Sequence, residues 1–454
     1  MKFQSVNPAT GQTLETFEET SPAALDQILA RAEAASRDWA HRPVQERAGR
    51  LRDAARILRE RKDGHARTMA LEMGKPLAQG VGEVEKCAWV CEYYAEQGEV
   101  FLAAQPRATD ASESYIRFDA IGPVFAIMPW NFPFWQVFRF AAPALLAGNA
   151  GILKHAPNVS RCALELEQVF REAGFPGGLF RAVLLSNEAA GAVIADPRVR
   201  AVTLTGSDRA GSQVAEQAGR YLKKTVLELG GSDPFIVLED ADVARAAETA
   251  AEARVINSGQ SCIAAKRFIV VDRVADRFIR GIAAAMEARK MGDPLDPATA
   301  IGPQARLDLR ANLHRQVEES LARGAEVVLG GRLPAGPGAF YPPTVLVSVR
   351  PGLPAFDEET FGPVAAVVRA SDEADAVRLA NASPYGLGAS VWTADTRRGE
   401  RIAGELEVGS VFVNGLVKSD PRLPFGGVKR SGYGRELSEY GLREFVNVKS
   451  VWIA

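Results

Sequence analysis

The sequence contains few of the residues from which many kinds of site are built. Its 454 residues include four cysteines, four histidines and no Cys-x-x-Cys pair, which excludes a disulfide framework and a zinc ribbon. Lys and Arg number 54 and Asp and Glu number 56, so the formal net charge is −2. The protein therefore has no overall positive charge that would favour binding to nucleic acid or to an acidic membrane surface. The scarcity of cysteine is typical of a reducing compartment, and we expect a cytoplasmic location.

Targeting and nucleotide-binding signals are also missing. The N-terminal sequence MKFQSVNPATG lacks the charged-then-apolar pattern of a signal peptide. The run 120–138 has no charge, but Pro123, Pro129 and Pro133 interrupt it. It therefore predicts a strand and a loop inside a large core and not a membrane span. The dinucleotide motif GxGxxG is absent as well.

The length and the hydrophobic pattern predict two α/β domains. A chain of 454 residues is longer than a domain with a single hydrophobic core usually is. The first hundred residues are mainly helical by pattern, with helices expected after the Ser21-Pro22 cap and over 43–62 and 81–104. Short apolar runs then alternate with helices, which predicts parallel sheets covered on both faces, in two series before and after about residue 230. The expected strands are 124–128, 151–154, 181–185, 201–205, 225–229, 235–238, 267–271, 326–329, 364–368, 389–392 and 410–413.

One cysteine lies in a setting unusual for a structural residue. Residues 255–268 read VINSGQSCIAAKRF, so Cys262 follows Ser258, Gly259, Gln260 and Ser261. Structural cysteines are among the most buried residues and lie in apolar faces, whereas this turn is small and polar. The stretch alone leaves both a reactive thiol and a core cysteine open.

Two βα junctions resemble ligand sites. In AVTLTGSDRAG a strand leads into Gly206-Ser207 and a helix, whose N-terminus can receive a phosphate. The same residues also suit a plain helix cap. Lys154 ends the strand in GILKHAPN, where α/β sheets bind ligands, and the alternative is a solvated strand-end charge.

Four separated motifs occur in an order that resembles the aldehyde dehydrogenase superfamily. They are PWNFP (129–133), LELGG (227–231), GQSC (259–262) and EETFGP (358–363). The resemblance covers nearly the whole chain, from NPATG (7–11) to PFGGVKRSGYGRE (424–436), and is strongest to bacterial succinate-semialdehyde dehydrogenases. The segments that carry this narrower likeness are FWQVFR (134–139), LKHAPN (153–158), LGGSDPFIVL (229–238) and FYPPTVL (340–346).

The resemblance assigns catalytic roles that chemistry also supports. Cys262 is implied to be the nucleophile, because a thiol attacks an aldehyde readily and also leaves readily from the thioester that hydride loss produces. Glu228 in LELGG is implied to activate the hydrolytic water, and otherwise it is a costly buried charge. Asn131 in PWNFP is implied to form the oxyanion hole with the backbone N–H of Cys262; in isolation it would suit a turn.

The resemblance also implies an NAD or NADP site and no metal. Glu359 would hold the nicotinamide ribose, Phe361 would support the ring, Lys154 would reach the adenosine ribose and Ser207 the pyrophosphate. The full set of cofactor-binding candidates is Trp130, Lys154, Gly206, Ser207, Leu229, Glu359 and Phe361.

The resemblance defines the substrate site less completely than the catalytic and cofactor sites. Arg139, eight residues after Asn131, is expected either in the substrate tunnel, where a carboxylate would need a cation, or as a helix-end or core charge. Some relatives carry a second arginine six residues before the nucleophile, but this chain has Ile256 there. We expect Arg422 to supply the missing charge. The substrate-binding candidates are Trp135, Arg139, Ser419 and Arg422.

The family fold implies a Rossmann-like cofactor domain (1–102 and 119–229), a catalytic domain (230–425) and an oligomerisation extension (103–118 and 435–454). The tail EFVNVKSVW (444–452) alternates like a strand, and an unpaired terminal strand would be an aggregation-prone edge. In the family such tails pair with a neighbouring subunit, so we expect a homodimer or homotetramer. The alternatives to succinate-semialdehyde oxidation are another small aldehyde, a CoA-acylating variant or a non-catalytic ligand-binding relative.

Cofactor choice gives the first testable prediction. Many NAD-preferring relatives carry an acidic residue three positions after the lysine, where it repels a 2′-phosphate; this chain has Pro157. Because no negative charge at that position rejects NADP, both cofactors should support turnover. Steady-state kinetics with each cofactor measures this. A kcat/KM for NADP more than about a thousandfold below that for NAD would contradict the argument.

Overall fold

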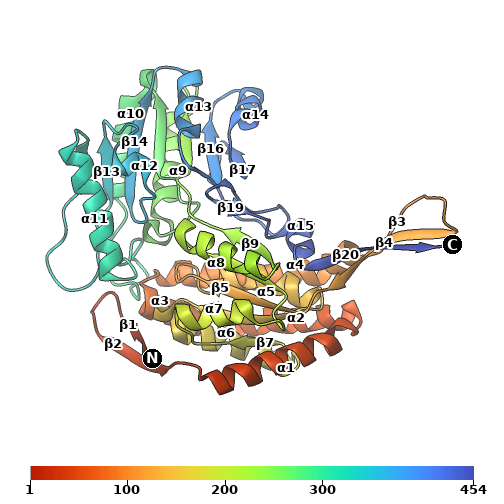
Figure 1. The fold of residues 1–454 in the computed structure, drawn as a ribbon. Coiled ribbons are helices and arrows are strands. Elements are labelled where there is room, and N and C mark those ends of the chain that lie inside the picture. The colour runs from red at the N-terminus through yellow and green to blue at the C-terminus, as the bar shows by residue number, and fades with distance from the viewer. Residues whose placement is uncertain (1) are drawn as a thin grey trace.

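The computed structural model describes residues 2–454 and contains two large sheets (Figure 1). The first has six strands in the order β19-β9-β8-β5-β6-β7. Its strands are β5 (Pro123–Met128), β6 (Ala150–His155), β7 (Phe180–Ala182), β8 (Ala201–Thr205), β9 (Lys224–Glu228) and β19 (Gly432–Tyr433). The helices of this half are α1 (Pro22–Ala40), α2 (Val44–Glu60), α3 (Lys62–Met73), α4 (Leu77–Leu102), α5 (Trp135–Leu146), α6 (Ser160–Glu172), α7 (Asn187–Ala195) and α8 (Asp208–Arg220).

The second sheet has seven strands in the order β12-β13-β14-β11-β10-β16-β17 and forms the upper half of Figure 1. Its strands are β10 (Pro234–Val237), β11 (Arg267–Val271), β12 (Glu326–Leu329), β13 (Thr344–Val347), β14 (Val364–Ala370), β16 (Gly388–Trp392) and β17 (Ser410–Val413). Its helices are α9 (Val243–Val255), α10 (Asp272–Glu287), α11 (Leu307–Ala322), α12 (Pro354–Asp357), α13 (Glu373–Asn381) and α14 (Thr396–Glu405).

The predicted α/β class and all the predicted strands are confirmed, and the chain passes from one sheet to the other between β9 and β10, near residue 230. The run 120–138 forms β5, a loop and the start of α5. No helix among residues 2–454 is long and apolar enough to cross a membrane.

The structure contains several elements that the sequence pattern did not predict. The first hundred residues also contain a hairpin, β1 (Lys2–Val6) and β2 (Thr13–Glu18), and an additional helix, α3. The sheets are mostly but not wholly parallel, because β12 and β19 run antiparallel to their neighbours. A shorter pair joins β15 (Tyr385–Gly386) to β18 (Val428–Lys429).

The strand order of the first sheet creates a place for a ligand. From β5 the chain continues through α5 to β6 and β7 on one side, while β8 and β9 lie on the other. Strands β5 and β8 are therefore neighbours whose connections diverge, and crevices open at the carboxyl ends of such strands. The PWNFP loop follows β5 and Gly206-Ser207 follows β8, so both motifs meet at this edge.

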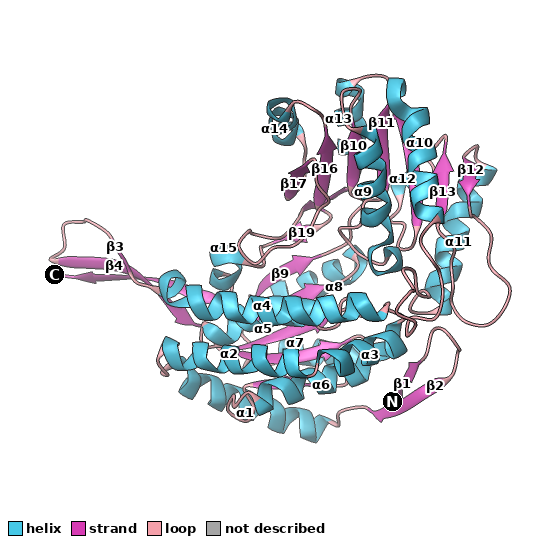
Figure 2. Ribbon diagram, turned by 180° about the vertical axis from the view of Figure 1, so that it is seen from behind, coloured by secondary structure: helices cyan, strands magenta, loops and turns pink. Residues whose placement is uncertain are grey.

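A three-stranded arm projects from the body (Figures 1 and 2). Its order is β20-β4-β3, with β3 (Gln105–Pro106), β4 (Glu113–Ala120) and β20 (Val446–Ile453). We expect the C-terminal strand to pair with a neighbouring subunit, but the sequence pattern did not indicate a partner within the chain: β20 pairs antiparallel with β4 from Val446↔Ala120 to Ile453↔Glu113. Pairing with a second subunit stays a prediction. The short helix α15 (Ser438–Arg443) precedes β20.

Candidate active site

The Cys262 thiol follows a turn with unusual backbone geometry. Asn257, Ser258 and Gly259 have φ values of 51°, 57° and 78°, in the left-handed region that disfavours side chains. Gly259 has no alternative, because a Cβ there would lie 2.1 Å from the backbone carbon of Gly362 in the EETFGP segment. The turn is therefore pressed against the segment that carries Glu359 and Phe361.

Hydrogen bonds tie this turn to the PWNFP loop. The Asn257 side-chain nitrogen donates to the Asn131 carbonyl oxygen at 2.6 Å. In return the Asn131 side-chain nitrogen donates to the Gln260 carbonyl oxygen at 3.1 Å, and Gln136 donates to the Asn131 side-chain oxygen. An amide nitrogen carries two N–H groups, so one remains for a ligand. No signal in the sequence indicated Gln136, because its role in orienting the Asn131 side chain depends on a contact that only the folded chain forms.

One cavity of about 310 Å³ brings together most of the predicted catalytic and cofactor residues. This volume is within the range for small-molecule sites. Phe361 meets Trp130 edge-on, with ring centroids 5.7 Å apart, and Glu359 accepts a hydrogen bond from the Gly231 N–H at 3.1 Å. The predicted residues that line the cavity are Trp130, Asn131, Gly206, Ser207, Leu229, Cys262, Glu359 and Phe361.

The cavity suits the nicotinamide end of a dinucleotide. Ser207 caps α8 by accepting from the Ala210 N–H, and it also lines the cavity. The N-terminus of α8 therefore lies at the cavity, where it can receive an anion. Gly230 leaves room beside Glu359, since a Cβ there would lie 2.5 Å from its carboxylate oxygen. Lys154 does not line this cavity; it is buried at the end of β6, and burial lowers its pKa.

A second cavity of about 390 Å³ lies on the other side of the thiol turn. Consecutive residues divide between the two cavities: Asn131 and Cys262 line the first, whereas Phe132 and Ile263 line the second. The wall of the second cavity is largely apolar, with Val255, Ile256, Leu416 and Val417, and its charged residues are Glu83, Lys86, Glu252 and Arg289. The turn that carries the thiol therefore lies between two cavities.

Burial controls the ionisation of both catalytic candidates. The pKa of Cys262 is raised to about 12 by burial, which the nearby charges of Arg139 and Lys266 oppose. The pKa of Glu228 is raised well above its usual range by burial and by the neighbouring Glu436, against the charge of Arg139. Neither oxygen of the Glu228 carboxyl group has a hydrogen-bond partner among the described residues. A carboxylate with a raised pKa is a stronger base once ionised.

Glu228 does not line the Cys262 cavity. Its side chain is directed toward Gly426, where an added Cβ would lie 2.7 Å from a Glu228 oxygen. The structure therefore leaves the role of Glu228 as the general base a prediction.

The predicted substrate residues separate into two groups. Ser419 and Trp135 lie together, because both contact the Lys86 ammonium group, at 2.7 Å from the serine hydroxyl and 4.3 Å from the indole centroid. Arg139 is 3% exposed and forms an ion pair with Glu436, with its guanidinium 4.5 Å from the Phe425 ring centroid.

The expectation that Arg422 supplies a charge to the substrate is not supported by its position. Its side chain is 67% exposed and forms an ion pair with Asp420 at 2.7 Å. It lies over the Trp89 ring and lines neither cavity beside the thiol. The loop directs Ser419 inward and Arg422 outward.

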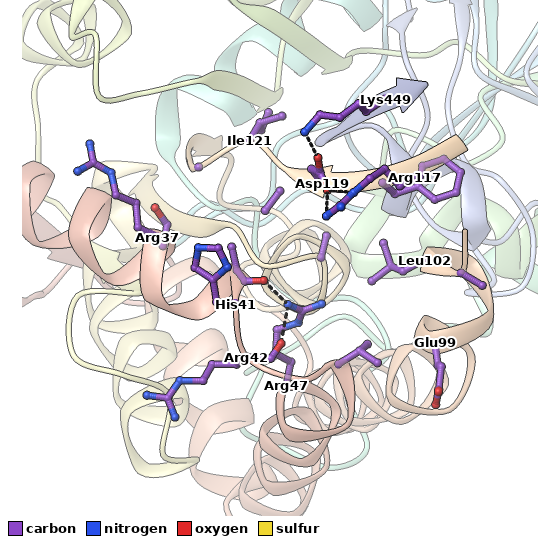
Figure 3. A pocket seen from close by; sticks show the side chains of 18 residues that line it. Arg37, His41, Arg42, Arg47, Glu99, Leu102, Arg117, Asp119, Ile121 and Lys449 are labelled. Atoms are coloured by element: carbon purple, nitrogen blue, oxygen red, sulfur yellow. Dashed lines mark hydrogen bonds and ion pairs between the residues drawn. The ribbon is translucent and has the colours of Figure 1, made fainter. Parts of the chain in front are cut away.

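A further cavity, of about 900 Å³, lies at the root of the arm (Figure 3). Its cations already have partners: Arg117 and Lys449 both bind Asp119, and Arg47 donates to the carbonyl oxygens of Ala40 and Arg42. It contains none of the predicted catalytic residues. No cluster of three His, Cys, Asp or Glu side chains suited to a metal occurs among residues 2–454.

Comparison with known proteins gives one consistent result. The sequence profile of the aldehyde dehydrogenase family matches residues 1–451. A probable succinate-semialdehyde dehydrogenase [NADP(+)] of Synechocystis is 50% identical over 454 residues, covering all of both chains. The succinate semialdehyde dehydrogenase [NAD(P)+] of Escherichia coli K12 is 49% identical over 99% of this chain and 97% of its own. The crystal structure of succinic semialdehyde dehydrogenase from Streptococcus pyogenes with NADP+ superimposes with a TM-score of 0.97, at 39% identity and 99% coverage of both chains.

The raised pKa of Cys262 predicts how the cofactor-free protein reacts with a neutral alkylating reagent. Only the thiolate reacts, so the rate of Cys262 alkylation by iodoacetamide should rise about tenfold per pH unit between pH 7 and 9. Cys87, Cys91 and Cys162 are fully buried and should stay unmodified in the folded protein. Peptide mass spectrometry over time measures each site. A rate that levels off below pH 8 would contradict the assignment.

Proposed function

Because the chain belongs to the aldehyde dehydrogenase family, we propose that it oxidises succinate semialdehyde to succinate with NAD(P)+ as the hydride acceptor. The observation that carries the proposal is that Cys262 lines the first cavity while its neighbour Ile263 lines the second, largely apolar cavity. Full-length identity near 50% to proteins named for this activity supports the substrate.

The reaction follows from the chemistry of the residues at the turn. The Cys262 sulfur adds to the aldehyde carbon, and Asn131 donates a hydrogen bond to the oxygen on which charge develops. Bound NAD(P)+ would accept the hydride that this adduct loses, and a thioester would remain on Cys262. Water adds to the thioester as Glu228 takes its proton, and the carboxylic acid leaves with the thiolate restored. Glu359 and Phe361 orient the cofactor.

Substrate kinetics test this proposal. Wild-type protein should form NAD(P)H from succinate semialdehyde with a kcat/KM at least about tenfold above that for butanal, because one charge-assisted contact to the carboxylate is worth about that factor. Added CoA should not change the rate, since water and not a thiol accepts the acyl group. A rate that depends on CoA would favour the acylating alternative, and equal kcat/KM values would remove succinate semialdehyde as the substrate.

We also propose that the protein is a homodimer or homotetramer joined through the arm. The arm exposes large apolar side chains, with Val448, Trp452 and Ile453 exposed by 58%, 55% and 44%. The outer edge of β20 carries unpaired backbone groups. Such a projecting strand is stabilised when a second copy covers it. The four cysteines, all free, support a cytoplasmic location.

Deletion of the residues after Arg443 tests the arm. The truncated protein loses β20, so it should run as a monomer or precipitate, because β4 loses its partner strand and its apolar face. Size-exclusion chromatography with light scattering measures the mass, and Val448→Lys is a milder variant that keeps the strand. An unchanged oligomer after truncation would refute the proposal.

A further inference from the structure

We propose that Lys86 is the specificity-determining residue that binds the carboxylate of the substrate, in the cavity that Ile263, the neighbour of Cys262, also lines. The inference rests on the proposed function and names a residue for a role that sequence analysis gave to Arg139 and Arg422. Lys86 and Ile263, the neighbour of Cys262, line the same cavity. A substrate that spans the cavity would therefore have its aldehyde near the thiol and its other end near the ammonium group.

Lys86 has the hydrogen-bonding capacity for this role. Its ammonium group donates to the Ser419 hydroxyl at 2.7 Å and lies over the Trp135 ring. An ammonium group has three donors, and the contact with Ser419 uses one. Among the described residues no carboxylate lies within ion-pair distance of Lys86. A partly buried cation without a counter-charge is costly, and a bound carboxylate reduces that cost.

The other cation of the cavity, Arg289, and the buried carboxylate of Glu83 already have partners. Glu83 binds Lys75 and accepts hydrogen bonds from the N–H groups of Phe134 and Trp135 at the start of α5. Arg289 is bound to Glu248 at 2.7 Å, and Glu252 is exposed. Lys86 is therefore the cation of this wall that remains for an anionic ligand.

The apolar wall fits the rest of the substrate. The side chains of Val255, Ile256 and Val417 line the same cavity, and they provide contacts for methylene groups but no hydrogen bonds. A short chain with an aldehyde at one end and a carboxylate at the other matches this pattern. The arginine that some relatives have at position 256 would duplicate the charge that Lys86 supplies from α4.

The surroundings of Lys86 make its charge sensitive to pH. Its pKa is lowered to about 8 by burial and by Arg139, against the attraction of Cys87, Asp420 and Glu83. The ammonium form predominates below this pKa and is lost above it. The preference for succinate semialdehyde over butanal, expressed as a ratio of kcat/KM values, should therefore fall as the pH rises from 7 to 9.5. Ionisation of Cys262 affects both aldehydes and cancels in the ratio.

Three variants of the full-length protein test the assignment. Lys86→Met keeps the length and the contact with Trp135 but removes the charge, and Lys86→Arg keeps the charge. Arg289→Met removes a second cation of the same wall that already has a partner. For each variant kcat/KM is measured with succinate semialdehyde and with butanal, and succinate is tested as a competitive inhibitor of butanal oxidation.

Lys86→Met should lower kcat/KM for succinate semialdehyde by about ten- to a hundredfold more than for butanal and should weaken inhibition by succinate. Lys86→Arg should restore most of this difference, and Arg289→Met should affect the two aldehydes equally. An equal loss on both aldehydes with Lys86→Met, or no loss, would overturn the proposal. The wild-type ratio is measured separately: if it shows no preference, the proposed function fails, whereas a preference that survives Lys86→Met refutes only the role of Lys86.

Discussion

The exchange of hydrogen bonds between Asn131 and the 257–260 turn is the interaction on which the rest of the site depends. Asn257 donates to the backbone of Asn131, and Asn131 donates to the backbone of Gln260. One partner follows β5 of the first sheet, and the other precedes β11 of the second. Each such bond contributes only about 0.5–1.5 kcal/mol, but a buried group left without its partner costs about 1–3 kcal/mol. The exchange therefore fixes the thiol relative to both cavities.

The same contacts maintain a backbone conformation that the turn would not adopt alone. Two consecutive non-glycine residues, Asn257 and Ser258, occupy the left-handed region, at a cost of about 1–3 kcal/mol each. Lys266 helps to offset this cost, because its buried ammonium group donates to the carbonyl oxygens of Ser261, Cys262 and Ala264. Because these carbonyl oxygens are hydrogen-bonded, the loop after Cys262 keeps its conformation beside the thiol.

His155 has no role in the proposed reaction, but it supports the loop that carries Asn131. Its Nε2 lies 2.9 Å from the Pro133 carbonyl oxygen, and its Nδ1 contacts the Ala156 N–H at 3.0 Å and the Met128 carbonyl oxygen at 3.2 Å. Burial lowers its pKa to about 4, so the ring stays neutral at physiological pH. It joins β6 to the loop that carries Asn131 and does not act as a base for Cys262.

The sequence allowed the α/β class, the strands and the set of residues around Cys262 to be predicted, because apolar runs and motif order depend on local pattern. It did not reveal where long side chains point. Arg139 and Arg422 were both predicted to bind the substrate carboxylate, yet one is paired with Glu436 in the core and the other with Asp420 at the surface. Lys86 belongs to no motif, and its position depends on α4 packing beside Trp135 and Ser419. The β20–β4 pairing was missed for a similar reason, since it joins segments more than 300 residues apart.

The proposed reaction requires that a covalent thioester forms on Cys262 and that Glu228 is needed for its hydrolysis. The most direct measurement is a rapid acid quench of Glu228→Gln protein mixed with succinate semialdehyde and NAD(P)+, followed by peptide mass spectrometry. We expect NAD(P)H to form in an amount stoichiometric with the enzyme and the peptide containing Cys262 to gain one succinyl group. Formation of NAD(P)H without any adduct on Cys262, or an adduct on another residue, would contradict the account.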